Sequence, residues 1–136
     1  MGKHEVRAWD RRIFLAGLML AVSGVHEQAR ASTPSPLGQW ARADGDTKID
    51  ITKCGQDYCA VNIWVRDPNG AEKVGDKLVL TLAPTANPDI LKGPAYDVRR
   101  KMHYTMSMTL IGTHMRTKGC VLFGVICKSA QWNRVN

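Results

Sequence analysis

The chain has 136 residues, 44 % of them hydrophobic and 23 % charged, which is the composition of one ordinary globular domain and excludes a disordered chain. Lys and Arg number 19 against 12 Asp and Glu, so the formal net charge is +7. No apolar run approaches the roughly 20 residues that a membrane-spanning helix needs, so we expect no transmembrane span in the mature protein.

Residues 1–31 have the three parts of a secretory signal peptide. A basic stretch containing Arg11 and Arg12 precedes an apolar run over residues 13–22, and a polar stretch closes on Ala29-Arg30-Ala31. The apolar run is too short for a stable membrane span, which makes an uncleaved anchor the weaker alternative. We predict cleavage after Ala31, a mature chain that begins at Ser32, and a periplasmic location.

The export route is left open by the basic pair Arg11-Arg12. Followed by Ile13-Phe14-Leu15, it resembles a twin-arginine signal, although Asp10 stands where Ser or Thr is usual. Twin-arginine export carries folded proteins, and a chain that needs disulfides would first have to fold in a reducing cytosol. We therefore favour the general secretory route.

The four cysteines form two sequence-local pairs, Cys54 with Cys59 and Cys120 with Cys127. Of the three possible connectivities we predict the local disulfides, because each pair flanks a turn that brings its ends within bridging distance. A zinc site needs cysteines two to four residues apart with further ligands converging, and neither pair has that spacing. We expect no metal.

After a short extended leader at residues 32–36, residues 37–136 have the pattern of a single all-β domain. Short alternating runs are separated by turn signals roughly every 10 to 15 residues. The eight expected strands are residues 37–42, 47–53, 58–66, 77–82, 90–98, 102–111, 114–120 and 126–135. Eight short antiparallel strands can form a sandwich or a small β-barrel, lipocalin-like or similar. We favour the barrel because closure removes exposed sheet edges.

The register between the second and third expected strands stays open. Pairing Cys54 opposite Cys59 places Ile51 beside Asn62, whereas a shift of one residue places Ile51 beside Val61. A bulge near the cysteines would satisfy both requirements.

A row of large side chains lies on one face of the expected strand at residues 102–111. This row either fills the core or lines a cavity that accepts an apolar ligand. Trp64 shares its strand face with Asn62 and Arg66, which suits either the mouth of such a cavity or a position that covers the stem of a lysine side chain. The candidate ligand-lining residues are Trp64, Met102, Tyr104, Met106 and Met108. Trp40 and Trp132 lie near the two ends of the domain, which predicts that the first and last strands meet.

Basic residues lie in the turn before the expected strand at residues 102–111 and on the strand at residues 114–120 that follows it. They are Arg99, Arg100, Lys101, Arg116 and Lys118. Export argues against nucleic acid as the partner, so we expect either a solvated face or contact with an anionic envelope component such as lipid headgroups.

Several segments together resemble the bacterial domain of unknown function family 2147. They are Gly38-x-Trp40, the segment from Ile49 to Cys59, the strand from Val61 to Val65, and the ending from Arg116 to Arg134. The chain departs from the family at Ala60, where Gly is common, and in the short loop Asn87-Pro88-Asp89. The resemblance implies an exported, mostly β, barrel-like domain, and it carries no established reaction or catalytic residues.

No hydrolase elbow, zinc-protease motif or phosphate-binding glycine loop is present, so we assign no catalytic residue and no cofactor. His103 and His114, expected on solvated faces, are too few for a metal site. We predict a monomeric, non-enzymatic module that binds a small apolar ligand or associates with the envelope. The alternative is a small periplasmic hydrolase or other envelope enzyme.

Overall fold

The structure is a computed structural model that describes Gly24 and residues 34–135. Apart from Gly24, the predicted signal peptide, its cleavage site and the twin-arginine motif lie outside the described residues. Within the described part of the chain, no helix is long and apolar enough to cross a membrane.

The described residues contain nine strands and no helix, which confirms the all-β prediction. The strands are β1 (Gly38–Arg42), β2 (Thr47–Cys54), β3 (Asp57–Val65), β4 (Lys77–Leu80), β5 (Ala83–Pro84), β6 (Ile90–Asp97), β7 (Met102–Ile111), β8 (His114–Val121) and β9 (Ile126–Val135). Eight of them match the expected strands to within a few residues. The ninth, β5, is a two-residue strand that pairs with β6.

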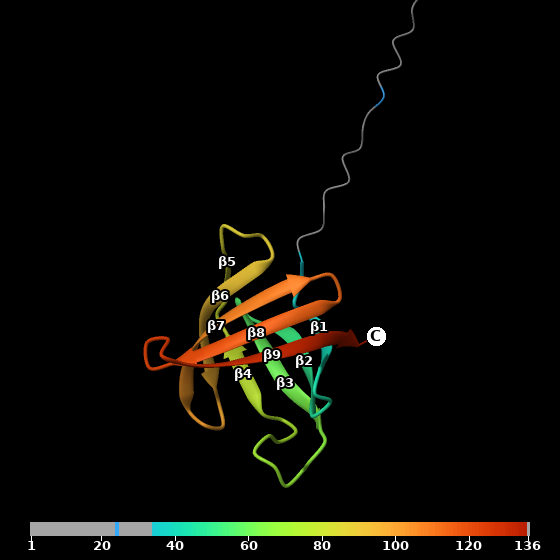
Figure 1. The fold of residues 1–136 in the computed structure, drawn as a ribbon, viewed down its shortest axis with the longest axis vertical. Coiled ribbons are helices and arrows are strands. Elements are labelled where there is room, and N and C mark those ends of the chain that lie inside the picture. The colour runs from blue at the N-terminus through green and yellow to red at the C-terminus, as the bar shows by residue number, and fades with distance from the viewer. Residues whose placement is uncertain (1–23, 25–33, 136) are drawn as a thin grey trace, which may run out of the picture. The chain divides into compact units, whose positions relative to one another are not determined.

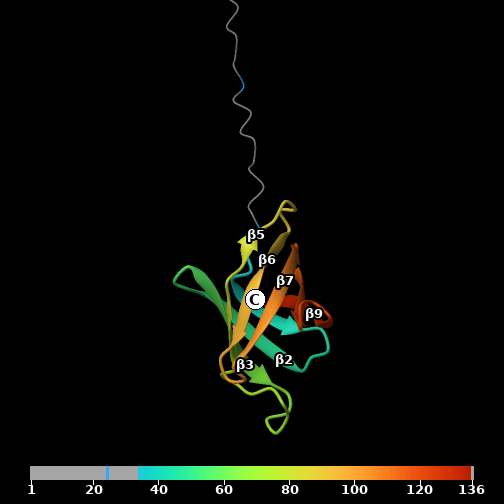
Figure 2. The same ribbon diagram turned by 90° about the vertical axis from the view of Figure 1, so that its left-hand side faces the viewer.

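Eight strands close into an antiparallel barrel (Figures 1 and 2), as predicted. The order runs from β1 through β2, β3, β4, β6, β7 and β8 to β9, which returns to pair with β1. Arg42 lies opposite Trp132 at the β1–β9 contact, and Leu80 lies opposite Ala95 at the β4–β6 contact. The first and last strands therefore meet, as the two tryptophans suggest.

Two-residue turns set the register of two hairpins. Gly55 and Gly112 each occupy the first turn position and have positive φ angles of 68° and 58°. A side chain at that position of a type II′ turn is strained, and this explains glycine there.

The β2–β3 register differs from both alternatives that the sequence left open. The Gly55-Gln56 turn pairs Cys54 with Asp57, and the Cys54–Cys59 disulfide therefore joins diagonal neighbours. The register shift lies between Lys48 and Ile49, at the far end of the hairpin and not near the cysteines. Ile63 has no partner residue in this pairing, and its side chain is exposed. The tight turn fixes the register, because a two-residue loop admits only one pairing.

Inward-facing side chains of most strands form the core of the barrel. Its buried members include Trp40, Ile49, Ile51, Leu80, Leu91, Met108, Leu110, Met115 and Trp132. Both buried indoles satisfy their N–H groups: Trp40 Nε1 donates to the Pro36 carbonyl and Trp132 Nε1 to Thr117 Oγ1. The core is continuous around Trp40, which has no exposed surface.

Candidate functional site

A cavity of about 390 Å³ opens at one end of the barrel, where side chains do not fill the interior. All eight strands of the barrel contribute lining residues, and the loop between β3 and β4 lies at its mouth. The apolar part of the wall is formed by Ile49, Ala60, Leu78, Tyr104, Met106, Ala130 and Trp132. Asn62, Thr117 and Ser129 add polar groups to this wall.

The cavity exists partly because β8 presents a glycine to it. Gly119 lies opposite Met106 across β7 and β8. A Cβ built at Gly119 would lie 3.5 Å from Met106 Cε and 4.0 Å from Tyr104 Cδ1, which is ordinary contact. A Cβ at this position would therefore fit without a clash, and glycine leaves this part of the cavity wall without a side chain.

The structure distributes the candidate ligand-lining residues over three environments. Tyr104 and Met106 line the cavity. Met108 lies deeper in the core at 1 % exposure, and Met102 is 41 % exposed near the strand end. Trp64 is on the outer surface, with Lys48 Nζ 5.5 Å from its ring centroid.

Arginines fasten the β3–β4 loop at the cavity mouth. Arg42 donates to both carboxylate oxygens of Glu72, at 2.7 and 2.9 Å, and Thr47 Oγ1 donates to Glu72 as well. Arg99 and Arg100 both donate to the backbone carbonyl of Ala71, at 2.7 and 2.9 Å. These contacts join a loop to residues about 30 positions away in the sequence.

The carboxylates at the mouth are held in their charged form. The Arg42 hydrogen bond lowers the pKa of Glu72, and the Arg99 hydrogen bond lowers the pKa of Asp76. Burial works to raise the pKa of Asp97, but hydrogen bonds from the backbone and guanidinium of Arg100 outweigh it, so the pKa is lowered. All three groups are anions at neutral pH.

The five residues of the predicted basic patch have different roles. Arg99 and Arg100 are engaged in the ion pairs described above, with Asp76 and Asp97. Lys101 is exposed in the β6–β7 turn, at a φ angle of 53°. Arg116 and Lys118 lie exposed on the outer face of β8, opposite Thr109 and Ser107 of β7.

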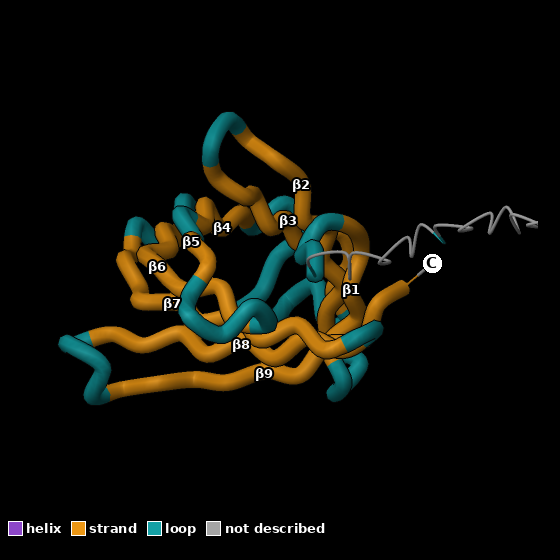
Figure 3. Tube along the Cα trace, turned by 90° about the horizontal axis from the view of Figure 1, so that it is seen from above, coloured by secondary structure: helices purple, strands orange, loops and turns teal. Residues whose placement is uncertain are grey.

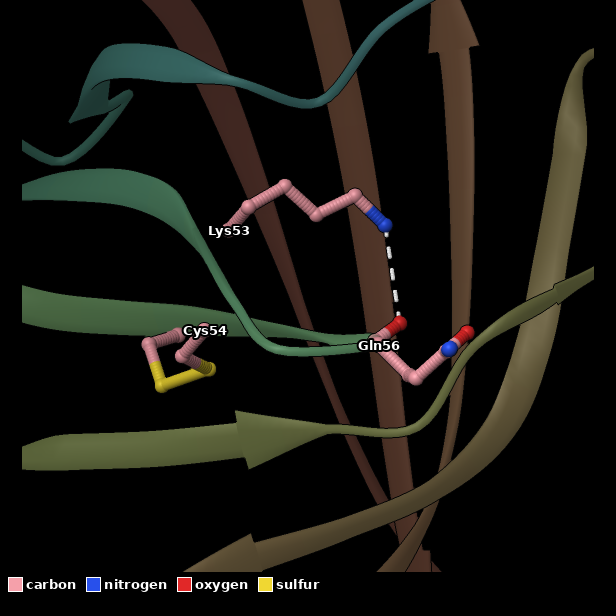
Figure 4. Close-up of a disulfide and its surroundings, with 4 residues drawn as sticks. Lys53, Cys54 and Gln56 are labelled. Carbon is pink, nitrogen blue, oxygen red and sulfur yellow. Dashed lines mark hydrogen bonds between the residues drawn. A yellow bond between two sulfur atoms is a disulfide. The ribbon is translucent and has the colours of Figure 1, made fainter.

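Both predicted disulfides are present. Cys54–Cys59 has a Cα–Cα distance of 5.8 Å and Cys120–Cys127 one of 4.1 Å. Figure 4 shows the first, at the end of the β2–β3 hairpin, with Lys53 Nζ donating to the Gln56 carbonyl across the turn.

His103 and His114, the two histidines among the described residues, lie in separate environments. His103 packs against Tyr96 with ring centroids 4.7 Å apart, and His114 Nδ1 lies 2.7 Å from Asn133 Oδ1. Among the described residues, no three His, Cys, Asp or Glu side chains converge to hold a metal ion.

One surface feature was missed in the sequence. The sequence predicts a turn between the expected strands at residues 114–120 and 126–135, and residues 122–124 lie in it. Leu122 and Phe123 are large apolar side chains that the structure exposes to solvent. The signal was available, since turns favour Gly, Asn, Asp and Ser, and two of these three residues are Leu and Phe.

The fold and cavity define a small closed β-barrel with one open end and a disulfide at each of two hairpins. A family model described as "Uncharacterized protein conserved in bacteria (DUF2147)" matches residues 38–134, and the chain belongs to this family. Comparisons with curated proteins and with solved structures found no match.

Proposed function

We propose that this protein is an exported binding module that takes a small amphipathic molecule into the open end of its barrel. The observation that carries the proposal is the cavity of about 390 Å³ with apolar walls and a charged rim. Sites for small molecules commonly measure about 300–1,000 Å³ and combine apolar walls with a few polar groups.

The lining indicates the chemical class of the ligand. An apolar body would contact Tyr104, Met106 and Trp132, which together offer aromatic and adaptable thioether surface. At the rim, Lys77 and Lys128 have no carboxylate within ion-pair distance among the described residues. Their ammonium groups suit a ligand with an anionic or hydrogen-bond-accepting head.

The electrostatics of the rim favour binding over hydrolysis. A carboxylic acid that donates a proton near neutral pH needs a raised pKa. The pKa values of Glu72, Asp76 and Asp97 are lowered, and each of these groups is paired with an arginine. Their arrangement supports a structural role in holding the loop at the mouth.

Filling the cavity tests the binding proposal. Gly119→Leu adds a side chain to the cavity wall beside Met106, and Gly119 lacks the positive φ angle that would strain a substituted residue. We expect affinity for the probe anilinonaphthalene sulfonate to fall at least about tenfold, because the probe loses most of its apolar contact. Thr105→Leu adds the same side chain on the outer face of β7 and should leave affinity unchanged.

Two results would contradict binding in the cavity: equal probe affinity in Gly119→Leu and the wild type, or a wild type that binds no probe. Melting temperatures of both variants should match the wild type, which shows that the barrel is intact. Native mass spectrometry of the protein as the cell accumulates it should also reveal a retained small molecule.

Export to the periplasm is the second part of the proposal. Two disulfides are compatible with an oxidising compartment, and residues 1–31 have the pattern of a signal peptide. N-terminal sequencing of the accumulated protein should find Ser32 as its first residue. A chain that keeps Met1 and reduced cysteines in the cytoplasmic fraction would refute export.

A further inference from the structure

The β8–β9 hairpin ends in an exposed apolar tip, which we define as Leu122, Phe123, Val125 and Ile126. Phe123 is 109 % exposed, Val125 79 %, Leu122 64 % and Ile126 56 %. Figure 3 shows this hairpin extending beyond the rest of the barrel. Single exposed apolar residues are common on proteins, but four within five consecutive positions indicate an interaction site.

The tip is held outward by its own backbone. Leu122 and Phe123 have positive φ angles of 51° and 56°, a conformation that costs energy for side chains other than glycine. The Cys120–Cys127 disulfide lies one residue pair behind the last ladder pair, Val121 with Ile126. A cross-linked hairpin of this kind presents its apolar side chains without losing much further freedom when they bind.

Positive charge surrounds the tip. No Asp or Glu follows Asp97, and the remaining 39 residues contain seven Lys and Arg. Lys118 and Lys128, which we call the cationic collar, lie three and two residues behind the last ladder pair. At a rise of about 3.3 Å per residue, the collar stands about 7–10 Å behind the base of the tip.

We propose that the apolar tip inserts into the surface of an anionic lipid bilayer while the cationic collar contacts lipid phosphates. Interfacial elements enter a bilayer by about 5–10 Å, which brings the collar to the level of the headgroups. Long lysine side chains reach the phosphates while their stems stay near apolar surface. Lys128 also lies at the rim of the cavity, whereas the apolar tip and Lys118 are not among the residues that line it.

The charge pattern favours a bilayer over a second copy of the chain. Two copies docked through their tips would cover the apolar side chains but would offer the cationic collars no opposite charge, because the β8–β9 hairpin contains no Asp or Glu. An anionic bilayer offers an apolar interior to the tip and a negatively charged surface to the collar behind it.

Vesicle sedimentation tests the proposal on the oxidised protein in the form that cells accumulate. We expect binding to vesicles of phosphatidylcholine mixed with phosphatidylglycerol, weak binding to phosphatidylcholine alone, and loss of binding at high salt. Phe123→Ser should weaken binding at least about tenfold, because the largest inserted side chain is removed. Lys118→Gln and Lys128→Gln should each weaken it about fivefold.

Ile111→Ser is the matched control. Ile111 is 65 % exposed in the β7–β8 hairpin, at the opposite end of β8 from the tip, and its replacement should leave vesicle binding unchanged. All variants carry the same N-terminal residues, so differences among them report on the tip. Gly119→Leu should also bind vesicles as the wild type does, which separates this test from that of the cavity.

Four outcomes would overturn the proposal. The wild type could fail to bind anionic vesicles, or it could bind both lipid compositions equally. Phe123→Ser could bind as tightly as the wild type. A dimer in analytical ultracentrifugation that Phe123→Ser abolishes, without vesicle binding, would assign the tip to self-association.

Discussion

Arg42 is the residue with the most contacts at the cavity mouth. Its side chain is 15 % exposed, it makes a two-pronged ion pair with Glu72 and another with Asp44, and its guanidinium lies 5.9 Å from the Trp132 ring centroid. Because a planar guanidinium matches a carboxylate through two parallel hydrogen bonds, lysine would not replace it. Arg42 therefore links the barrel wall to the β3–β4 loop.

Replacing Arg42 with Gln should lower the free energy of unfolding by about 1–2 kcal/mol at neutral pH. Hydrogen bonds to charged groups contribute about 1.5–3 kcal/mol, and the partial exposure of Glu72 reduces that figure through solvent screening. Urea denaturation measures the loss. Arg66→Gln is the control, because Arg66 is 62 % exposed in its pair with Asp46 and should contribute little.

The effect of Arg42→Gln should depend on pH. Arg42 lowers the pKa of Glu72 below its ordinary value of 4.5. A carboxylate with a lowered pKa in the folded state adds stability above its unfolded pKa, and that stability is lost as pH falls through the folded value. The difference in unfolding free energy between the wild type and Arg42→Gln should therefore begin to shrink as pH falls below about 4.5. It should disappear below the lowered pKa that Glu72 has in the folded state. A difference that stays constant down to acidic pH would show that the ion pair does not act through Glu72.

At the scale of elements, the two disulfides should contribute unequally. Replacing Cys120 and Cys127 with Ser removes a cross-link between exposed strand ends and should cost about 2–3 kcal/mol in the chain-entropy model. Replacing Cys54 and Cys59 should cost more, although their loop is shorter, because Cys59 is 4 % exposed and a serine there buries a hydroxyl. Guanidinium denaturation of the two double variants compares them, and an equal or reversed order would contradict this reasoning.

The strands were predictable as elements because alternation is a local property. In β7, Met106, Met108 and Leu110 are buried and Thr105 is exposed, as period-two alternation requires. The β2–β3 register was not predicted, since the cysteines suggested a directly opposed pair. Gly55-Gln56 set a tighter turn, and the disulfide bridges the diagonal that this turn creates. Turn length was thus a better guide to register than the cysteine positions.

At the scale of the whole molecule, closure depends on the last strand. Truncation after Gln131 removes Trp132 and the residues of β9 that pair with Gln39, Trp40 and Ala41. Losing a buried tryptophan costs about 3–5 kcal/mol, comparable to the total stability of a small domain. We expect the truncated chain to lose its circular dichroism signal and thermal transition, whereas a chain ending at Val135 should keep both. A truncated chain with a native melting curve would show that β9 is peripheral.

The sequence by itself determined the strands and the pairing of the four cysteines, because each depends on patterns within about ten residues. The barrel was favoured over a sandwich by the number of short strands and the benefit of closure, and not by a local pattern. Only the tertiary structure decided which large side chains line the cavity, fill the core or face solvent. The depth of a side chain within a barrel depends on how tilted strands from the whole chain come together. On the single strand β7, Tyr104 lines the cavity, Met108 is buried in the core and Met102 is exposed. Of the predicted basic residues, Lys101, Arg116 and Lys118 are exposed. The tertiary structure also decided that Arg99 and Arg100 brace a loop. Their partners Ala71 and Asp76 are distant in sequence, and closure of the barrel brings them near.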